Sequence, residues 1–413
     1  MEAVLSSTQE DGLLDSLDFR PSGKSAQYVL ASRKVKLFAE SSDTFGINSR
    51  VIRWRITGNE FWEPGSTRIE FVLHNLDASH NLVPVSNPLG MFSRIRTFIS
   101  GIEIENLDYV GEIGVVQDRL KGANRRLNDS TEAHFLASGH TDTYSPILPG
   151  KSRRVMLTLP CGITQTNEKW VPLALCAGGV VIEMELSADV AQAFEASPTP
   201  SWSIKDVALC TNLHQVDPSL SNSYSRHLLS GNSISYHQKS MTVTKHLLTD
   251  SSFTLPIVRG YTRLCQIFVT LHKNGEKAIT HFFHPCNGQN VDTTTDTCTI
   301  QISVDALRFP ERPMQSVAEQ FLRLREAAGV FYGESDISIL PADFVTRKFI
   351  AGIDLEKVGS QGASHSGLST ANGSILTVDC KNSGLGASGD YALVYLYYDS
   401  LFSLRDGSVD VFQ

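Results

Sequence analysis

Histidine and cysteine side chains gather at one place in the chain, the segment 280–286, which reads THFFHPC. His281, His284 and Cys286 are residue types that bind zinc and other transition metals, but a complete site would need one or two further ligands from elsewhere. None of the 12 histidines forms a His-x-His pair. We therefore favour a plain strand or loop here, and predict no metal ligand, no cofactor and no catalytic residue.

Two Gly-Lys-Ser strings, at 23–25 and 150–152, resemble the end of a phosphate-binding loop. That loop also needs a glycine five residues earlier, where Asp18 and Ser145 stand instead. The string at 362–366, GASHS, lacks the second glycine of the turn that presents a catalytic serine in hydrolases. These failures together favour a structural protein over an enzyme.

The chain has 413 residues and a formal net charge of −8. A protein whose whole surface binds nucleic acid neutralises phosphates with Lys and Arg, so the charge argues against that role, and we expect no sequence-specific binding of nucleic acid. No apolar run approaches the roughly 20 residues that cross a bilayer. Residues 1–20 also lack the basic start and apolar block of a signal peptide, so we expect neither leader nor anchor.

Cysteines are scattered along the chain, odd in number and never spaced as Cys-x-x-Cys. The seven are Cys161, Cys176, Cys210, Cys265, Cys286, Cys298 and Cys380. This usage is typical of reduced thiols in an intracellular compartment. We expect them to serve as small apolar core residues.

From residue 49 onward the dominant hydrophobic period is two. Ile52, Trp54 and Ile56 alternate with Arg53 and Arg55, as in a strand with one buried face. The same habit or an aromatic variant of it recurs at 69–73, 182–186, 265–271, 300–304 and 391–398. The chain is therefore predicted to be all-β with a few short helices.

In each half of the chain a hairpin is followed by a helix and then by a long polar loop. Two-residue turns are expected at 100–101 and 305–306. Asp108 is the expected N-cap of the first helix, and 316–319, SVAE, is a capping box at the start of the second. The expected stops are Gly122 and Gly329. Turns, caps and stops recur at an offset of about 206 residues, which predicts two copies of one structural plan.

Each copy has many short strands separated by turn residues, the profile of a β-sandwich with Greek-key connections. Between the copies the alternation breaks, and Leu220, Tyr224, Leu228 and Leu229 are spaced like a short helix. Residues 1–25 have too few apolar positions to form a core element. We predict an arm at 1–25, a first sandwich at 26–216, a linker at 217–247 and a second sandwich at 248–413.

Several strings, in this order along the chain, carry a resemblance to a known family. They are WSIKDV at 202–207, HLLSG at 227–231, RFPERPMQS at 308–316 leading into AEQFLRLR at 318–325, FIAGIDLEK at 349–357 and LVYLYYD at 393–399. With them the sequence resembles the double jelly-roll major capsid proteins of the polinton-like virus, virophage and large eukaryotic DNA virus lineage. The resemblance runs from about residue 28 to the end, by order of segments more than by identity.

The resemblance implies two tandem jelly-roll β-sandwiches per chain. It also implies a homotrimer whose six barrels form a pseudo-hexagonal block, and an icosahedral shell tiled by such blocks. Implied partners are neighbouring copies, penton and minor capsid proteins and an internal membrane, in a virion assembled inside the host cell. Candidate outward loops are 123–150, 289–297, 332–343 and 359–371, and the arm is a candidate for inward contacts.

Two other classes share a β-sandwich architecture and stay open at this point. A metal-dependent bicupin is also a tandem of jelly rolls, but binds its metal through the His-x-His pair that is missing here. A carbohydrate-binding β-sandwich protein would use loop residues to hold sugar. Self-association without metal or sugar separates the capsid hypothesis from both.

Overall fold

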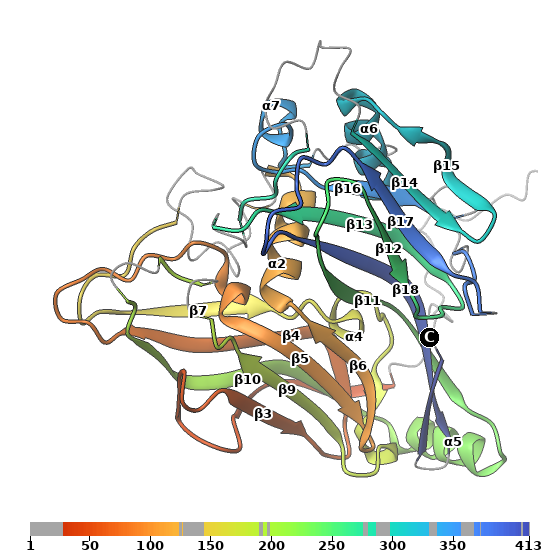
Figure 1. Cartoon of the computed structure of the whole chain (residues 1–413). Coiled ribbons are helices and arrows are strands. Elements are labelled where there is room, and N and C mark those ends of the chain that lie inside the picture. The colour runs from red at the N-terminus through yellow and green to blue at the C-terminus, as the bar shows by residue number, and fades with distance from the viewer. Residues whose placement is uncertain are drawn as a thin grey trace, which may run out of the picture.

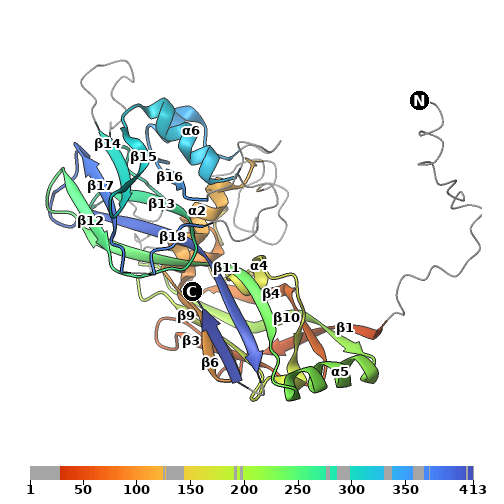
Figure 2. The same cartoon turned by 90° about the vertical axis from the view of Figure 1, so that its right-hand side faces the viewer.

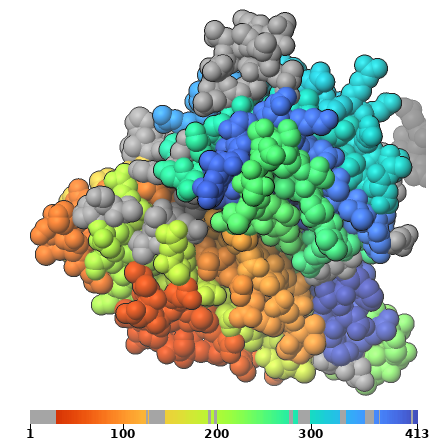
Figure 3. Space-filling model, viewed as in Figure 1, coloured from red at the N-terminus to blue at the C-terminus, as the bar shows by residue number. Residues whose placement is uncertain are grey.

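The computed structural model describes residues 28–123, 126, 144–189, 193–195, 199–275, 280–285, 298–329, 337–356, 367–371, 373–405 and 408–412. Within these ranges the chain forms two lobes, stacked one above the other in Figure 1. On the face drawn in Figure 3, atoms of the lower lobe (red to yellow-green) meet those of the upper lobe (green to blue) along a continuous contact. Each lobe is built from two antiparallel sheets.

The first lobe pairs a sheet of strand order β1-β10-β4-β7 with a sheet of order β3-β9-β5-β6. The bounds are β1 Val29–Phe38, β3 Val51–Ile56, β4 Phe61–Asn75, β5 Phe92–Ile99, β6 Ile102–Asp108, β7 Ser152–Thr158, β9 Val180–Leu186 and β10 Trp202–Val216, with the short β2 (Thr44–Phe45) and β8 (Val171–Pro172) at the margin of the first sheet. In β3, Ile52, Trp54 and Ile56 are completely buried while the residues between them are exposed. The predicted period of two is therefore confirmed there.

The second lobe pairs a sheet of order β11-β18-β13-β16 with a sheet of order β12-β17-β14-β15. The bounds are β11 Ile234–Leu247, β12 Phe253–Ile257, β13 Leu264–His272, β14 Thr299–Val304, β15 Leu307–Met314, β16 Ala351–Asp354, β17 Leu376–Lys381 and β18 Tyr391–Arg405, with β19 (Ser408–Phe412) added beside β18. Unlike β3, the central strand β13 is buried on both faces over most of its length.

The two lobes repeat one topology. When the eight main strands of each lobe are matched in chain order, β1 with β11 and so on to β10 with β18, both sheets of the first lobe reproduce those of the second. Eight antiparallel strands arranged in two such sheets form a jelly roll. The predicted all-β fold of two tandem jelly rolls is confirmed.

The hairpin-plus-helix unit also occurs in both lobes. β5 and β6 meet at Ser100 and Gly101, which have φ angles of 52° and 80°, and α2 (Val110–Leu120) follows. In the second lobe β14 and β15 form the hairpin and α6 (Val317–Ala327) follows, with the Ser316 hydroxyl accepting a hydrogen bond from the Glu319 N–H at 3.1 Å. The prediction of Asp108 as the first N-cap is wrong. Asp108 is the last residue of β6, and the helix starts after a left-handed Tyr109 that makes no side-chain cap.

The segment expected to be a linker, 217–247, contains two regular elements. The predicted helix is α5 (Pro218–Leu229), capped by the Asp217 side chain. Residues 234–247 are β11, which pairs with β18 along its whole length, so this part belongs to a sheet of the second lobe. Figure 2 shows β11 and β18 continuing past the second lobe, beside the first, toward α5. The domain bounds themselves stay a prediction.

The core is formed mainly by aliphatic and aromatic side chains, and the largest fully buried ones include Trp54, Trp62, Tyr236, Tyr261 and Tyr395. Among the described residues, no helix combines the length and the apolar character of a membrane-spanning segment. The predicted arm at 1–25 and most of the predicted outward loops lie outside the described residues.

Candidate functional site

The most elaborate polar arrangement of the described chain lies where the two lobes meet, and α2 stands at its centre (Figure 1). Residues 110–116 of this helix are all buried. Gly114 is needed where the helix crosses the short 3₁₀ helix η2 (Pro88–Met91), because a Cβ there would lie 2.9 Å from the Leu89 side chain. The glycine that weakens the helix in the sequence is thus explained by close packing.

Arg119, on the last turn of α2, reaches from the first lobe into the second. Its side chain is almost fully buried, with 6% of the residue exposed. The guanidinium donates to the carbonyl oxygens of Thr280 and Arg347, and lies 4.2 Å from the centre of the Phe282 ring. Charged hydrogen bonds and a cation–π contact in a dry environment are among the stronger polar interactions of proteins.

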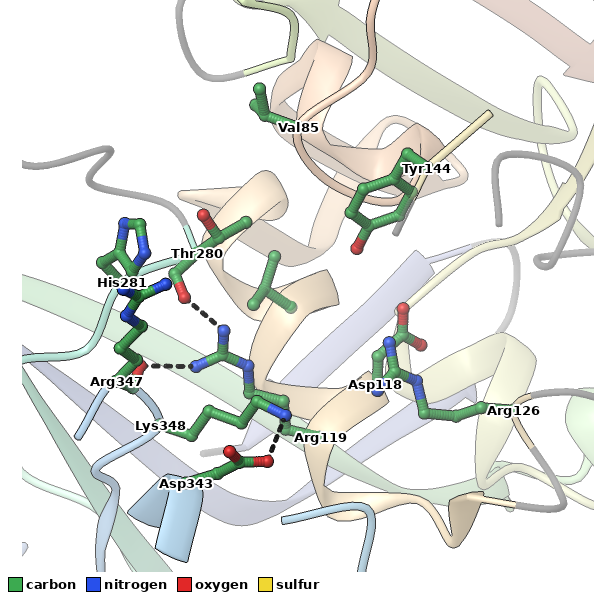
Figure 4. Close-up of a pocket in the computed structure, with 11 residues that line it drawn as sticks. Val85, Asp118, Arg119, Arg126, Tyr144, Thr280, His281, Asp343, Arg347 and Lys348 are labelled. Atoms are coloured by element: carbon green, nitrogen blue, oxygen red, sulfur yellow. Dashed lines mark hydrogen bonds and ion pairs between the residues drawn. The ribbon is translucent and has the colours of Figure 1, made fainter. Parts of the chain in front are cut away.

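A cavity of about 300 Å³ lies beside Arg119 and is lined by both lobes. Figure 4 shows Arg126, Asp118 and Tyr144 on one side of it, and Lys348 with Asp343 on another. Lys348 is 9% exposed and its ammonium lies 2.9 Å from the Asp343 carboxylate. Charged side chains thus form much of the cavity wall, and some of them pair with one another, unlike in a mainly apolar ligand pocket. We call this polar boundary between the two lobes the seam.

Ser338 of the second lobe forms hydrogen bonds with the C-terminal end of α2. Its N–H donates to the carbonyl oxygens of Arg119 and Lys121, at 3.1 and 2.8 Å. Its hydroxyl donates to the carbonyls of Asp118 and Arg119 and accepts from the Arg126 guanidinium at 3.2 Å. One serine thus satisfies several carbonyl groups that the helix end leaves without an internal partner.

Glu105 of β6 bridges the lobes at a second place. Its carboxylate accepts from the Gly162 N–H at 2.9 Å, within the first lobe, and from the Ser240 hydroxyl of β11 at 2.6 Å. Burial raises the pKa of this carboxyl from 4.5 to about 7, although hydrogen bonds from Ser240 and from the backbone of Gly162 and Ile163 act in the opposite direction. The group is therefore poised between its neutral and charged forms near neutral pH.

Beside Glu105 the backbones of the lobes approach each other closely. Gly162 begins α4 (Gly162–Gln165), and a Cβ on it would lie 2.4 Å from the Lys239 carbonyl oxygen of β11. The Lys239 N–H donates to the Thr166 hydroxyl at 2.8 Å, which links the same strand to the end of α4. Only glycine fits at 162 without moving one lobe against the other.

Two of the three candidate metal ligands, His281 and His284, lie in the described part of the chain. His284 is buried, with the rings of Phe344 and Phe349 at 5.5 and 4.8 Å from its ring, while His281 lines the cavity at the seam. Cys286 lies outside the described residues. Within the part of the chain that the structure describes, no group of three or more His, Cys, Asp or Glu is placed to hold a metal ion.

The residues of the seam were not singled out by the sequence. Arg119, Glu105 and Ser338 have no motif, and their partners are 57 to 228 positions away in the chain. A weak signal is the composition of α2, whose sequence VGEIGVVQDRL is too apolar for a helix with a solvated face.

The sequence matches no protein-family model and no curated protein. The structure is similar to solved virus structures along nearly the whole chain. VP54 of PBCV-1, fitted into a cryo-EM reconstruction of the virophage Sputnik, gives a TM-score of 0.63 at 12% identity, over 94% of this chain and 98% of that chain. The Faustovirus major capsid protein gives 0.59 at 10% identity, over 98% of this chain and 94% of that one.

This chain is a double jelly roll. The 3.5 Å cryo-EM structure of the Sputnik virophage agrees, with a TM-score of 0.55 at 10% identity over 98% of this chain and 92% of that chain. The likeness covers both lobes of this chain and nearly the whole of the other chains. At 10 to 12% identity it concerns the fold.

Proposed function

We propose that this protein is a structural major capsid protein that assembles into trimeric, pseudo-hexagonal capsomers, which tile an icosahedral shell. The observation that carries the proposal is the duplication of one jelly roll on a fixed, buried seam. Three copies around a threefold axis present six similar lobes, which approximate a hexagon. A second support is the fold shared with the Faustovirus major capsid protein.

The seam gives the lobes a defined relative angle, which a shell component needs. Buried polar groups are costly when unmatched, so the contacts of Arg119, Ser338 and Glu105 favour one docking register over sliding alternatives. The polar contacts at the seam therefore serve to fix the relative orientation of the two lobes. Nothing in its arrangement calls for a substrate, and we propose no enzymatic activity.

The partners of the proposed function are other copies of the chain, first within the trimer and then between neighbouring capsomers. Penton and minor capsid proteins and an internal membrane are further proposed partners. The proposed location is the virion, after assembly inside the host cell. Sequence-specific binding of nucleic acid has no part in the proposal.

Light scattering and negative-stain microscopy of the purified full chain test the proposal. A stable trimer, or hexagonal particles and sheets, is the expected result. A monomer that binds stoichiometric metal would overturn the proposal and favour a bicupin, and a monomer that binds sugar through its loops would favour a carbohydrate-binding protein. Measuring the mass with a chelator present, and again without one, separates self-association from metal-driven aggregation.

A further inference from the structure

Two cysteine thiols face each other inside the second lobe. The sulfur atoms of Cys298 and Cys380 are 4.0 Å apart, and the residues are 3% and 2% exposed. Cys380 lies in the central strand β17, and Cys298 immediately precedes the neighbouring strand β14 (Figure 1). The residues are 82 positions apart in the chain, so the fold and not the local sequence brings the thiols together.

The strand register places these side chains on the same face of the sheet. Thr299 pairs with Lys381 and Ile300 pairs with Cys380, so Cys298 is the diagonal neighbour of Cys380 across the ladder. A disulfide requires the sulfur atoms to approach to about 2.05 Å, which takes a side-chain rotation and a small backbone shift. Cys298 precedes the first residue pair of the β14–β17 ladder, Thr299 with Lys381, so a shift at Cys298 leaves the pairs of that ladder in place.

Other cysteines of the described chain contact different groups. The thiol of Cys176 donates to the Pro172 carbonyl, that of Cys265 to the Arg263 carbonyl and that of Cys210 to the Glu70 carboxylate. These thiols are held as weak donors, as expected for core cysteines. Among the described cysteines, Cys298 and Cys380 are the pair whose thiols face each other.

We propose that the thiols of Cys298 and Cys380 form a disulfide when the protein is exposed to a peroxide. In the first step one thiol reduces hydrogen peroxide, becoming a sulfenic acid and releasing one water. In the second step the sulfur of the other thiol attacks the sulfenic sulfur, the S–S bond forms and a second water leaves. The two thiols lose two electrons and two hydrogens in all. A small oxidant suits thiols this deeply buried.

The Cys298–Cys380 disulfide would stabilise the second lobe because it closes a long loop of the chain. The segment between the cysteines contains β14, β15, α6, β16 and most of β17. Restricting so long a loop in the unfolded chain is expected to raise the melting temperature of this lobe on the order of 10 °C. Its biological role rests on the proposed capsid function. A shell assembled from the reduced protein inside a cell would become more stable when the disulfide forms in oxidising surroundings after release.

The experiment treats the reduced, purified full chain with hydrogen peroxide and maps its peptides without reduction. We expect a linked pair of peptides that contain residues 298 and 380, a raised melting temperature, and reversal of both by dithiothreitol. Cys380→Ser and Cys298→Ser should lose the link and the shift. Cys176→Ser, a matched buried thiol, should keep both.

The inference is overturned if the wild-type map shows no 298–380 link while other thiols oxidise, if either thiol links to Cys286 instead, or if the linked protein melts at the same temperature as the reduced one. The wild-type map decides the matter even where a serine variant fails to fold. Oligomer mass measured under reducing conditions tests the capsid proposal separately, so the two can fail independently.

Discussion

Replacing Glu105 with glutamine should flatten the pH dependence of stability between pH 5 and pH 8. In the folded protein burial raises the pKa of this carboxyl from 4.5 to about 7. Since the folded state holds the proton more tightly than the unfolded chain, the stability associated with this group is greatest below pH 4.5 and falls as the pH rises through about 7. At 1.36 kcal/mol for each pH unit of the gap, the whole loss is about 3 kcal/mol, of which about 2.5 kcal/mol falls between pH 5 and pH 8.

The assay is urea unfolding of wild type and Glu105→Gln at pH 5, 6, 7 and 8. The informative quantity is the difference between the two proteins in their pH dependence, because Glu112, whose pKa is also raised by burial, contributes equally to both. Glutamine retains an acceptor for Gly162 and Ser240 but cannot ionise. The variant should therefore gain on wild type by about 2.5 kcal/mol between pH 5 and pH 8, whatever its offset at one pH.

The control is Glu103→Gln, an exposed carboxylate on the same strand that lines the same small polar cavity as Glu105. It should keep the wild-type pH dependence. If Glu105→Gln loses stability with pH as steeply as wild type does, the carboxyl is already ionised in the folded protein at pH 5, and the account of a desolvated acid at the seam is refuted.

Three further predictions concern the seam and the helices. Gly162→Ala should cost about 1 to 3 kcal/mol because its Cβ would meet the Lys239 carbonyl, whereas Gly65→Ala, with its nearest neighbour at 3.9 Å, should be nearly neutral in the same urea titration. Arg119→Met should cost about 3 kcal/mol and split the calorimetric transition in two; a single unshifted transition would contradict its role as a link between lobes. Ser316→Ala should cost about 1 kcal/mol and speed amide exchange in the first turn of α6, and unchanged exchange would count against the cap.

Much of the fold can be predicted from local sequence signals, because strands and turns depend on the types and spacing of a few neighbouring residues. The alternation around Trp54 and the turn at Ser100 are decided by neighbours in sequence, and both are confirmed. Asp108 shows the limit of such reasoning. It has the right residue type for a cap, but its carboxylate is 2.5 Å from the Arg94 guanidinium across the hairpin, and strand pairing extends to its position.

The strand β11 was missed for a related reason. Its polar residues read as a linker, yet Gln238 and Ser240 are buried because the strand is covered by the first lobe. In a strand that packs on a polar boundary, buried positions can be polar, so the sequence does not alternate between apolar and polar residues as it does in a strand between core and solvent. The contacts that cross the seam could not be predicted, since they join residues that only the docking of the two lobes brings together.

The two copies of the hairpin-plus-helix unit differ in how far their helices are buried. In the first lobe α2 is buried against the second lobe, and two of its three charged residues, Glu112 and Arg119, are buried as well. In the second lobe α6 packs one stripe on β16 through Leu324 and keeps several charged residues at the surface. If the charged residues of α6 were paired and buried as Arg119 is, a third lobe could dock on the second in the same way, and lobes could stack without limit. The partly exposed charges of α6 oppose such docking, because burying an unpaired charge is costly.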